Sequence, residues 1–488
     1  MPKQPLPDKP SLENLRKQAK SLRKSVLASE TAALFRVREF HPHPNEAIEK
    51  FSLSDAQLVI ARGHDFSSWS KLKEYLKLLD QHYFMPAMTR SADNAEPLAD
   101  RFIRLACLDY GSDHSNRRVQ AREILAQHPS ITQTNLYTAA TVGDMRVVEK
   151  ILNEDSKLAN LRGGPHNWEP LLYATYSRLD SEVKGHSTLA VARLLIERGG
   201  DPNAGFLWDG HYLFTALTGA FGEGEARPIH QPEHQYCYPL ARLLLEAGAD
   251  PNDGQTLYNR MFTGGTRHLE LLFDFGLGLN KNGIWSRRLG SLMDTPGEML
   301  QQQLGWAAKY NQMDRMRLLV EHGADVNTAD KRLHRTPYEL ALLHGNIEIA
   351  NYLLAHGARQ TTISELNAFA AACLSGDKAG ARLLLVKNAT LIAQLRERRV
   401  ELLQLAAEND KREAVRLVKE LGFDLNEIKR TTAMHHAVMS GHLEMVKLLI
   451  ELGADPVIRD TEFDATPLGW AEYGGHDEVA EFLKQFEA

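Results

Sequence analysis

The 488-residue sequence is poor in cysteine, with three residues, Cys107, Cys237 and Cys373, that lie far apart. There is no Cys-x-x-Cys pair and no disulfide framework, which is typical of proteins of a reducing cytoplasm. No apolar run approaches the roughly 18 residues of a membrane span, and the N-terminus has no apolar signal region. We therefore expect a cytoplasmic protein without membrane contact, with export by a specialised secretion system left open.

The short motifs of common catalytic sites are also missing, because the sequence contains neither a glycine-rich phosphate loop nor a G-x-S-x-G turn. Among its 20 histidines, His230 and His234 stand before Cys237 at a spacing that could bind zinc on a helix. Pro228 and Pro232 indicate a loop instead, and no fourth ligand is evident. We therefore expect no metal, no cofactor and no enzymatic activity.

Charge is unevenly distributed along the chain, whose net charge is −6. Up to Asp80 there are 14 Lys and Arg against 10 Asp and Glu, so this part carries +4 and the remainder −10. An acidic remainder disfavours binding to a phosphate backbone, so nucleic acid is not the expected partner. The basic N-terminal helix could contact nucleic acid or an acidic partner, or be a solvated face.

What the sequence has in abundance is repetition. The stretch from Thr431 to Asp460, TTAMHHAVMSGHLEMVKLLIELGADPVIRD, is echoed from Arg335 and again from Ala465. A period of roughly 33 residues indicates a stack of small units. Each copy has two apolar stripes at helical spacing around a central glycine such as Gly441. Because no unit can bury its apolar face alone, neighbouring units are expected to fold cooperatively as a stack.

These copies resemble the ankyrin repeat. Tails such as Gly453-Ala454-Asp455 and heads such as Thr466-Pro467-Leu468 match its signature. The resemblance implies two antiparallel helices per unit and a β-hairpin between units, hence an all-α fold with short β-hairpins. Aligning one position of each first helix gives an ankyrin-repeat solenoid of about eleven units. These positions are Ala106, Ala139, Ala174, Ala216, Arg260, Ala307, Ala341, Ala372, Ala406, Ala437 and Ala471.

Insertions interrupt the early units. SRLDSEVKGHS and GEGEARPIHQPEHQYCYP fall between the two helices of a unit, and GIWSRRLGSLMDTPGEM from Gly283 falls between units, where it should lengthen one finger. Insertions clustered on one region of a repeat array often mark a binding face. Neutral drift in exposed loops is the alternative.

Several aromatic and charged residues lie near these fingers and loops rather than in the helical stripes. Exposed aromatic and arginine side chains are favoured anchors at protein interfaces. Packing under the neighbouring loops is the alternative for any single tryptophan. We predict that the partner-binding residues are Trp168, Phe206, Trp208, Asp209, His230, His234, Trp285, Arg287 and Arg288.

The first 85 residues follow a different pattern. Ser11 is the expected N-cap of a helix with a stripe through Leu12, Leu15, Ala19, Leu22 and Val26. Further signals are a capping box at Ser52 and Asp55 and a helix start at Ser67 or Ser68. The pattern resembles a short helical module of bacterial ankyrin-repeat proteins, PSLExLRKQAK … DAQLVIA…FxSWxxLK, which implies a bacterial origin and no transferable role. The predicted organisation is a small helical domain (1–85), a linker (86–97) and the repeat array (98–488).

The predicted function is that of a protein-binding scaffold or adaptor. It would recognise a partner protein through the concave face, fingers and inserted loops of the units from about Thr134 to Asp330. An antitoxin or immunity protein and a host-directed effector are alternatives that also act by binding. A third alternative is an enzyme with a catalytic N-terminal module, against which the lack of a convergent nucleophile, base or metal set argues.

Overall fold

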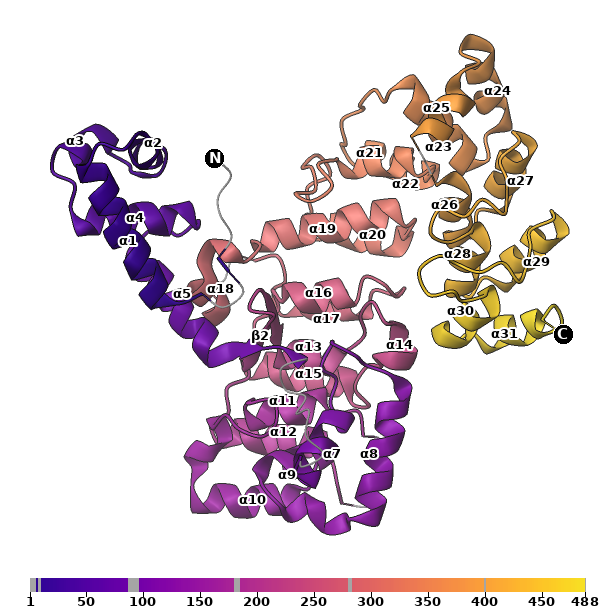
Figure 1. Ribbon diagram of the computed structural model, residues 1–488. Helices are drawn as coiled ribbons and strands as arrows, with labels where there is room; N and C mark the ends of the chain where they lie inside the picture. The colour runs from indigo at the N-terminus through magenta and orange to yellow at the C-terminus, as the bar shows by residue number, and fades with distance from the viewer. Residues whose placement is uncertain are drawn as a thin grey trace. The chain divides into compact units, whose positions relative to one another are not determined.

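The chain is helical almost throughout (Figure 1). The computed structural model describes residues 6–7, 10–86, 96–179, 185–279, 283–398 and 401–487. Most of the predicted linker, residues 87–95, therefore lies outside the described residues. Two compact units are present: unit 1 is Met1–Phe221, His234–Thr256 and Lys281–Met293, and unit 2 is Gly222–Glu233, Leu257–Asn280 and Asp294–Ala488. In the described ranges no helix is both long and apolar enough to span a membrane.

Five helices open unit 1, and the predicted caps of three of them are confirmed. The Ser11 side chain accepts a hydrogen bond from the Asn14 backbone, Ser52 and Asp55 form a capping box, and Ser68 caps the last helix. The stripe of the first helix faces a core that includes Val37, Ile60 and Leu72, with Leu15, Ala19, Leu22 and Val26 buried. The helices are α1 (Leu12–Leu27), α2 (Thr31–Phe40), α3 (Pro44–Glu49), α4 (Leu53–Gly63) and α5 (Trp69–His82).

Helix pairs follow in unit 1, and the first helices of successive pairs pack side by side. The small residues aligned from the sequence permit this approach, since Ala106, Ala139, Ala174 and Ala216 are fully buried. The helices are α7 (Leu98–Ala106), α8 (Ser115–Gln127), η1 (Pro129–Gln133), α9 (Leu136–Val142), α10 (Met145–Glu154), η2 (Ser156–Asn160), α11 (Pro170–Tyr176), α12 (Thr188–Glu197), α13 (Ala216–Phe221) and α15 (Cys237–Glu246). Helix α16 (Gly254–Asn259) follows.

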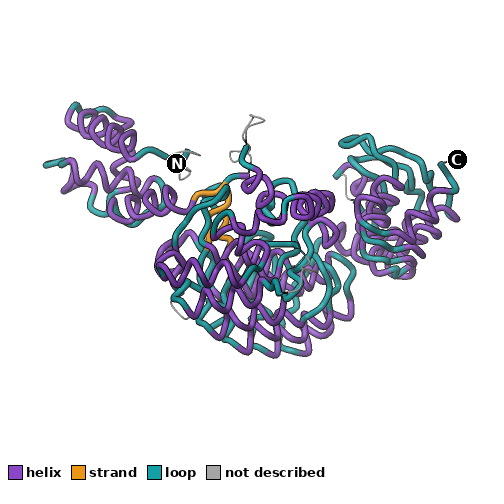
Figure 2. Tube along the Cα trace, turned by 90° about the horizontal axis from the view of Figure 1, so that it is seen from below, coloured by secondary structure: helices purple, strands orange, loops and turns teal. Residues whose placement is uncertain are grey.

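A small sheet joins the opening helices to the helix pairs (Figure 2, orange). Strand β1 (Tyr83–Phe84) continues from α5 and pairs in parallel with β2 (Gly205–Trp208), which pairs antiparallel with β3 (Tyr212–Thr215). The β2–β3 turn places Asp209 and Gly210 at φ of 50° and 72°. Asp-Gly is a preferred sequence for such hairpins because both positions need a positive φ. The segment from Gly283 forms a short helix, α18 (Ile284–Leu289), and a 3-10 turn, η3 (Gly290–Leu292).

Unit 2 is a run of helix pairs in which each first helix packs on the next. Gly453 has a φ of 96° just after α29, as the predicted helix end requires. Arg260 occupies the aligned position that is alanine in the other units, but it lies just after the end of α16 and is buried. Its guanidinium pairs with the Glu223 carboxylate at 2.7 Å. The helices are α14 (Arg227–His230), α17 (Arg267–Asp274), α19 (Pro296–Lys309), α20 (Met313–Glu321), α21 (Pro337–Leu343), α22 (Ile347–Ala355), α23 (Glu365–Ser375), α24 (Lys378–Lys387), α25 (Leu391–Glu397), α26 (Leu402–Glu408), α27 (Arg412–Glu420), α28 (Ala433–Met439), α29 (Leu443–Glu451), α30 (Pro467–Gly474) and α31 (Asp477–Lys484).

The substitution Ala437→Asp tests this packing, because Ala437 is fully buried on α28, which packs between α26 and α30. A carboxylate there can be neither hydrated nor paired, so we expect the free energy of unfolding of unit 2 to fall by about 3 kcal/mol or more. Urea unfolding measures the loss, and hydrogen exchange should locate it in α26–α31. Val457→Asp adds the same charge at a position 39% exposed and should change stability by less than about 0.5 kcal/mol. If the two variants lost equal amounts of unfolding free energy, the buried placement of Ala437 would be contradicted.

Candidate functional site

The segment from Gly283 is anchored by one tryptophan. Trp285 of α18 is 4% exposed and belongs, with Leu289 and Leu207, to the apolar core of the five opening helices. Its indole Nε1 donates a hydrogen bond to the Asn203 carbonyl at 2.8 Å. Gly205 makes room for the ring, because a Cβ there would lie 3.1 Å from it and 2.8 Å from a backbone oxygen. Helix α18 is therefore docked on α5 instead of projecting as a free finger.

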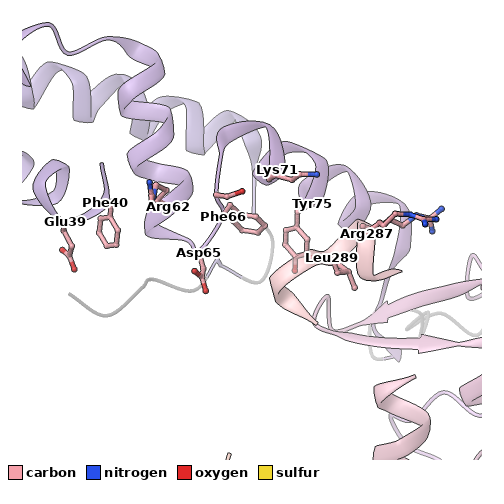
Figure 3. A pocket seen from close by; sticks show the side chains of 12 residues that line it. Glu39, Phe40, Arg62, Asp65, Phe66, Lys71, Tyr75, Arg287 and Leu289 are labelled. Carbon is pink, nitrogen blue, oxygen red and sulfur yellow. The ribbon is translucent and has the colours of Figure 1, made fainter. Parts of the chain in front are cut away.

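Docking of α18 leaves an open cleft of about 600 Å³ beside it (Figure 3). Figure 3 shows the lining side chains in a row that starts at Glu39 and Phe40 of α2 and ends at Arg287 of α18. The lining residues are Glu39, Phe40, Arg62, Asp65, Phe66, Ser67, Lys71, Tyr75, Arg287, Arg288, Leu289 and Gly290. The cleft thus has one wall from the opening helices and one from the inserted segment.

Aromatic and apolar side chains form part of the lining of the cleft. The rings of Phe66 and Tyr75 lie 5.1 Å apart, both are largely buried, and Leu289 and the half-buried Phe40 extend the surface. The Tyr75 hydroxyl donates to the Gly210 carbonyl at 3.0 Å, and burial raises the pKa of Tyr75. This hydroxyl therefore stays protonated and fixes α5 to the β2–β3 turn.

The rim of the cleft is charged and carries more cations than anions. Four basic side chains are exposed there, Arg62, Lys71, Arg287 and Arg288, against the carboxylates of Glu39 and Asp65. The Arg288 guanidinium lies 5.0 Å from the centre of the Trp285 ring, a cation–π geometry. Asp65 adopts a φ of 69°, a left-handed conformation that aspartate tolerates better than most residues.

A second, smaller cavity of about 270 Å³ lies on the other side of Arg288, which lines both. His82 sits in its wall with Nδ1 3.0 Å from the Gly205 carbonyl oxygen. Burial and the nearby Arg162 lower the pKa of His82 to about 4. Arg162 also pairs with Glu169 at 3.2 Å, and burial raises the pKa of that carboxyl. The wall of the cavity thus includes a neutral histidine and Glu169, whose ion-pair partner Arg162 lies outside the lining.

The sequence-predicted aromatic residues of the fingers lie mainly inside unit 1. Trp168 and Phe206 are fully buried and stacked at 4.5 Å, and Phe84 of β1 packs on both rings. Trp208 is half-buried, and its Nε1 donates to the Asp109 carbonyl at 3.1 Å. The expected exposure of these rings is not found, because β1 and α5 cover the fingers. Asp209 lies in the β2–β3 turn, and its backbone N–H donates to the Phe84 carbonyl.

The predicted histidines are buried as well. His230, in unit 2, has Nε2 3.0 Å from the Tyr473 carbonyl oxygen, and the two rings are 4.6 Å apart. His234, in unit 1, has Nε2 3.1 Å from the Thr188 hydroxyl, and burial lowers its pKa well below the ordinary value. Among the residues the structure describes, no group of three His, Cys, Asp or Glu side chains could hold a metal ion.

The structure therefore brings Arg287 and Arg288 together at an exposed rim, whereas the other seven predicted residues are buried or half-buried. Sequence reasoning missed the opposite wall, formed by Phe40, Phe66 and Tyr75. Phe40 and Tyr75 occupy ordinary positions of short helices, and Phe66 lies in the loop between α4 and α5. No local pattern indicates that α18, more than 200 residues later, packs on α5.

Comparison with known proteins identifies the C-terminal part of the chain. The family model for ankyrin repeats matches three times, over residues 296–364, 368–460 and 403–488. The chain is also similar to ankyrin repeat protein nuc-2 of Neurospora crassa, with 29% identity over 30% of this chain and 14% of that protein. A putative ankyrin repeat protein of Rickettsia bellii is 41% identical over 14% of this chain and 39% of its own length.

A third relative is the Notch-regulated ankyrin repeat-containing protein of Xenopus tropicalis, 45% identical over 11% of this chain and 45% of its own length. The chain thus spans less than half of each of these relatives. Together with the helix pairs of unit 2, the matches show that residues 296–488 are ankyrin repeats. The chain therefore contains ankyrin repeats in its C-terminal part, and repeats of this kind serve as protein-binding scaffolds.

Replacing the anchor of α18, Trp285→Ala, should loosen the contact between α18 and α5. We expect a loss of about 3–5 kcal/mol of unfolding free energy, as for other buried tryptophans, seen as faster hydrogen exchange in α5 and α18. Trp470→Ala in α30, whose indole donates to Asp460, is the matched control and should leave α5 protected. Unchanged exchange in α5 of the Trp285 variant would contradict the anchoring role.

Acid should destabilise unit 1 through His166. This ring is 3% exposed between Phe84 and Trp168, and neither of its nitrogens has a hydrogen-bond partner among the residues that the structure describes. Burial lowers its pKa to about 3. The pKa of His166 is lower in the folded state than in the unfolded state, where it is about 6.5. The contribution of the neutral ring to the unfolding free energy is therefore complete above pH 6.5 and is lost as the pH falls toward the folded-state pKa. Between pH 7 and 5 the loss is about 2 kcal/mol.

The variant His166→Phe removes this titration and keeps an aromatic ring in the cluster. We expect its unfolding free energy to fall less than that of the wild type between pH 7 and 5, measured by urea unfolding. His128→Phe, at an exposed position, should retain the wild-type pH dependence. Parallel pH curves for all three proteins would show that His166 does not stay neutral in the folded protein.

Proposed function

We propose that the protein is a non-catalytic binding scaffold and that a protein partner docks in the cleft between the opening helices and α18. The observation that carries this proposal is the exposed pair Arg287 and Arg288, at the rim of a cleft that also contains the rings of Phe40, Phe66 and Tyr75. Arginines beside aromatic surface are frequent energetic centres of interfaces. The ankyrin array of about eleven units over 98–488 would supply the rigid support.

The polar groups of the cleft support a binding role over a catalytic one. The Tyr75 hydroxyl is engaged by the Gly210 carbonyl, and the Lys71 ammonium lies 2.8 Å from Glu74. A covalent mechanism needs a nucleophile with a base in hydrogen-bonding reach, and these two groups are already committed elsewhere. An antitoxin, an immunity protein or a host-directed effector would use the same binding mode, and a bacterial cytoplasm is the setting we propose.

Photocrosslinking tests the proposal. A photoreactive phenylalanine analogue at Ser67, inside the cleft, should capture a partner in the cells that express the protein, whereas the same analogue at the exposed Val119 of α8 should not. The double substitution Arg287→Ala and Arg288→Ala should weaken binding of the captured partner by about 2 kcal/mol. The melting temperature should fall only slightly, because both side chains are exposed and the Arg288–Trp285 contact is a cation–π contact at the surface.

Equal capture at Ser67 and Val119 would place the partner elsewhere on the protein. If a partner is captured at Ser67 but its binding does not weaken in the double arginine variant, the partner docks in the cleft and the two arginines do not contribute to its affinity.

A further inference from the structure

We propose that the cleft recognises an acidic segment of the partner protein, one of whose apolar side chains packs on Phe40, Phe66 and Tyr75. This inference rests on the proposed function and names the chemistry of the partner. It draws on the charges of the rim, their order along the cleft and the aromatic part of its lining.

Four cations and two carboxylates line the cleft, and because Lys71 pairs with Glu74 at 2.8 Å the rim keeps an excess of one positive charge, in a chain whose net charge is −6. A basic cleft on an otherwise acidic protein attracts an anionic segment and repels like-charged surfaces, which favours one docking position. Arg287 and Arg288 are suited to carboxylates because a guanidinium can donate two parallel hydrogen bonds to one carboxylate.

The charges also have an order. In Figure 3, Glu39, Arg62 and Asp65 occupy the α2 half of the row, with one more carboxylate than cations, whereas Lys71 and Arg287 occupy the half toward α18. An extended segment would therefore place its acidic residues toward α18 and a neutral or basic residue toward α2. This order gives the segment a direction.

The apolar surface lies between the two ends. Phe66, Tyr75 and Leu289 are each less than 10% exposed, so they lose little freedom on binding, and the half-buried Phe40 offers more of its ring to a ligand. The volume of about 600 Å³ falls in the usual range of ligand sites, about 300–1,000 Å³. It accommodates one large side chain and its neighbours.

Nucleic acid fits this cleft less well than an acidic peptide. Glu39 and Asp65 stand among the cations and would oppose a continuous phosphate backbone. A peptide can place a neutral or basic residue beside these carboxylates, whereas a nucleic acid strand carries a phosphate at every step. The mixed rim therefore favours a peptide with acidic residues at one end only.

The test uses the full chain and three fluorescein-labelled probes in an anisotropy titration. The acidic peptide is Glu-Asp-Glu-Phe-Gly-Lys, the basic one is Lys-Arg-Lys-Phe-Gly-Glu, and the third probe is a single-stranded DNA oligonucleotide. We expect the acidic peptide to bind at least about tenfold more tightly than the other two, with affinity that falls as salt rises. Arg287→Glu with Arg288→Glu should weaken it about tenfold or more and should favour the basic peptide instead.

The matched control reverses two exposed charges elsewhere on unit 1, Arg146→Glu with Arg193→Glu, and should leave all three affinities unchanged. Phe40→Ala, at a half-buried position, should weaken the acidic peptide without reversing charge preference. Thermal unfolding of each variant confirms that it is folded.

Equal affinity for the acidic and basic peptides, or equal losses in the two double variants, would overturn the proposal. Preferential binding of the oligonucleotide would assign the cleft to nucleic acid and overturn it too. If the acidic peptide fails to bind while Ser67 still captures a partner, the acidic class is wrong and the proposed function stands. If both experiments fail, both proposals fall.

Discussion

The burial of Trp285 and Leu289 against α5 is the contact on which the candidate site depends. A six-residue helix such as α18 cannot persist alone, because so short a helix does not recover the free energy of its nucleation. It forms here since one of its faces completes the core of the opening helices. The same contact places two arginines beside the aromatic surface of Phe66 and Tyr75, so the cleft exists only while α18 is docked.

The same need to cover apolar surface explains the inserted loop of unit 2. Ile229 of α14 lies against Gly475, where even a Cβ would meet it at 2.7 Å, and His230 contacts Tyr473. An isolated repeat leaves apolar surface exposed, and neighbouring repeats or inserted segments must cover it. Two insertions that the sequence marks as potential partner surfaces are thus largely occupied by the chain itself, in unit 1 by α5 and in unit 2 by the last repeat.

Much of the local structure was predictable because its causes are local. Helix starts at Ser11, Ser52 and Ser68 follow from capping chemistry, and the positive φ of Gly453 follows from the end of an apolar stripe. The burial of Trp168 was not predictable, because it depends on strand β1 pairing with a hairpin more than 100 residues away. The burial of Trp285 was not predictable either, because it depends on α5, more than 200 residues earlier. A tryptophan outside a helical stripe fits an exposed anchor and a docked one equally well, and pairing between distant segments decides between them.

Arg287 and Arg288 differ from the other predicted residues for a physical reason. A guanidinium is expensive to bury without a paired anion, so arginines on a docked helix remain at its solvent edge while the apolar side chains turn inward. Arg288 loses further freedom through its contact with the Trp285 ring. An arginine held in this way gives up less conformational entropy when it binds a carboxylate. The docking that buries the aromatic anchor therefore also preorganises the charge that remains exposed.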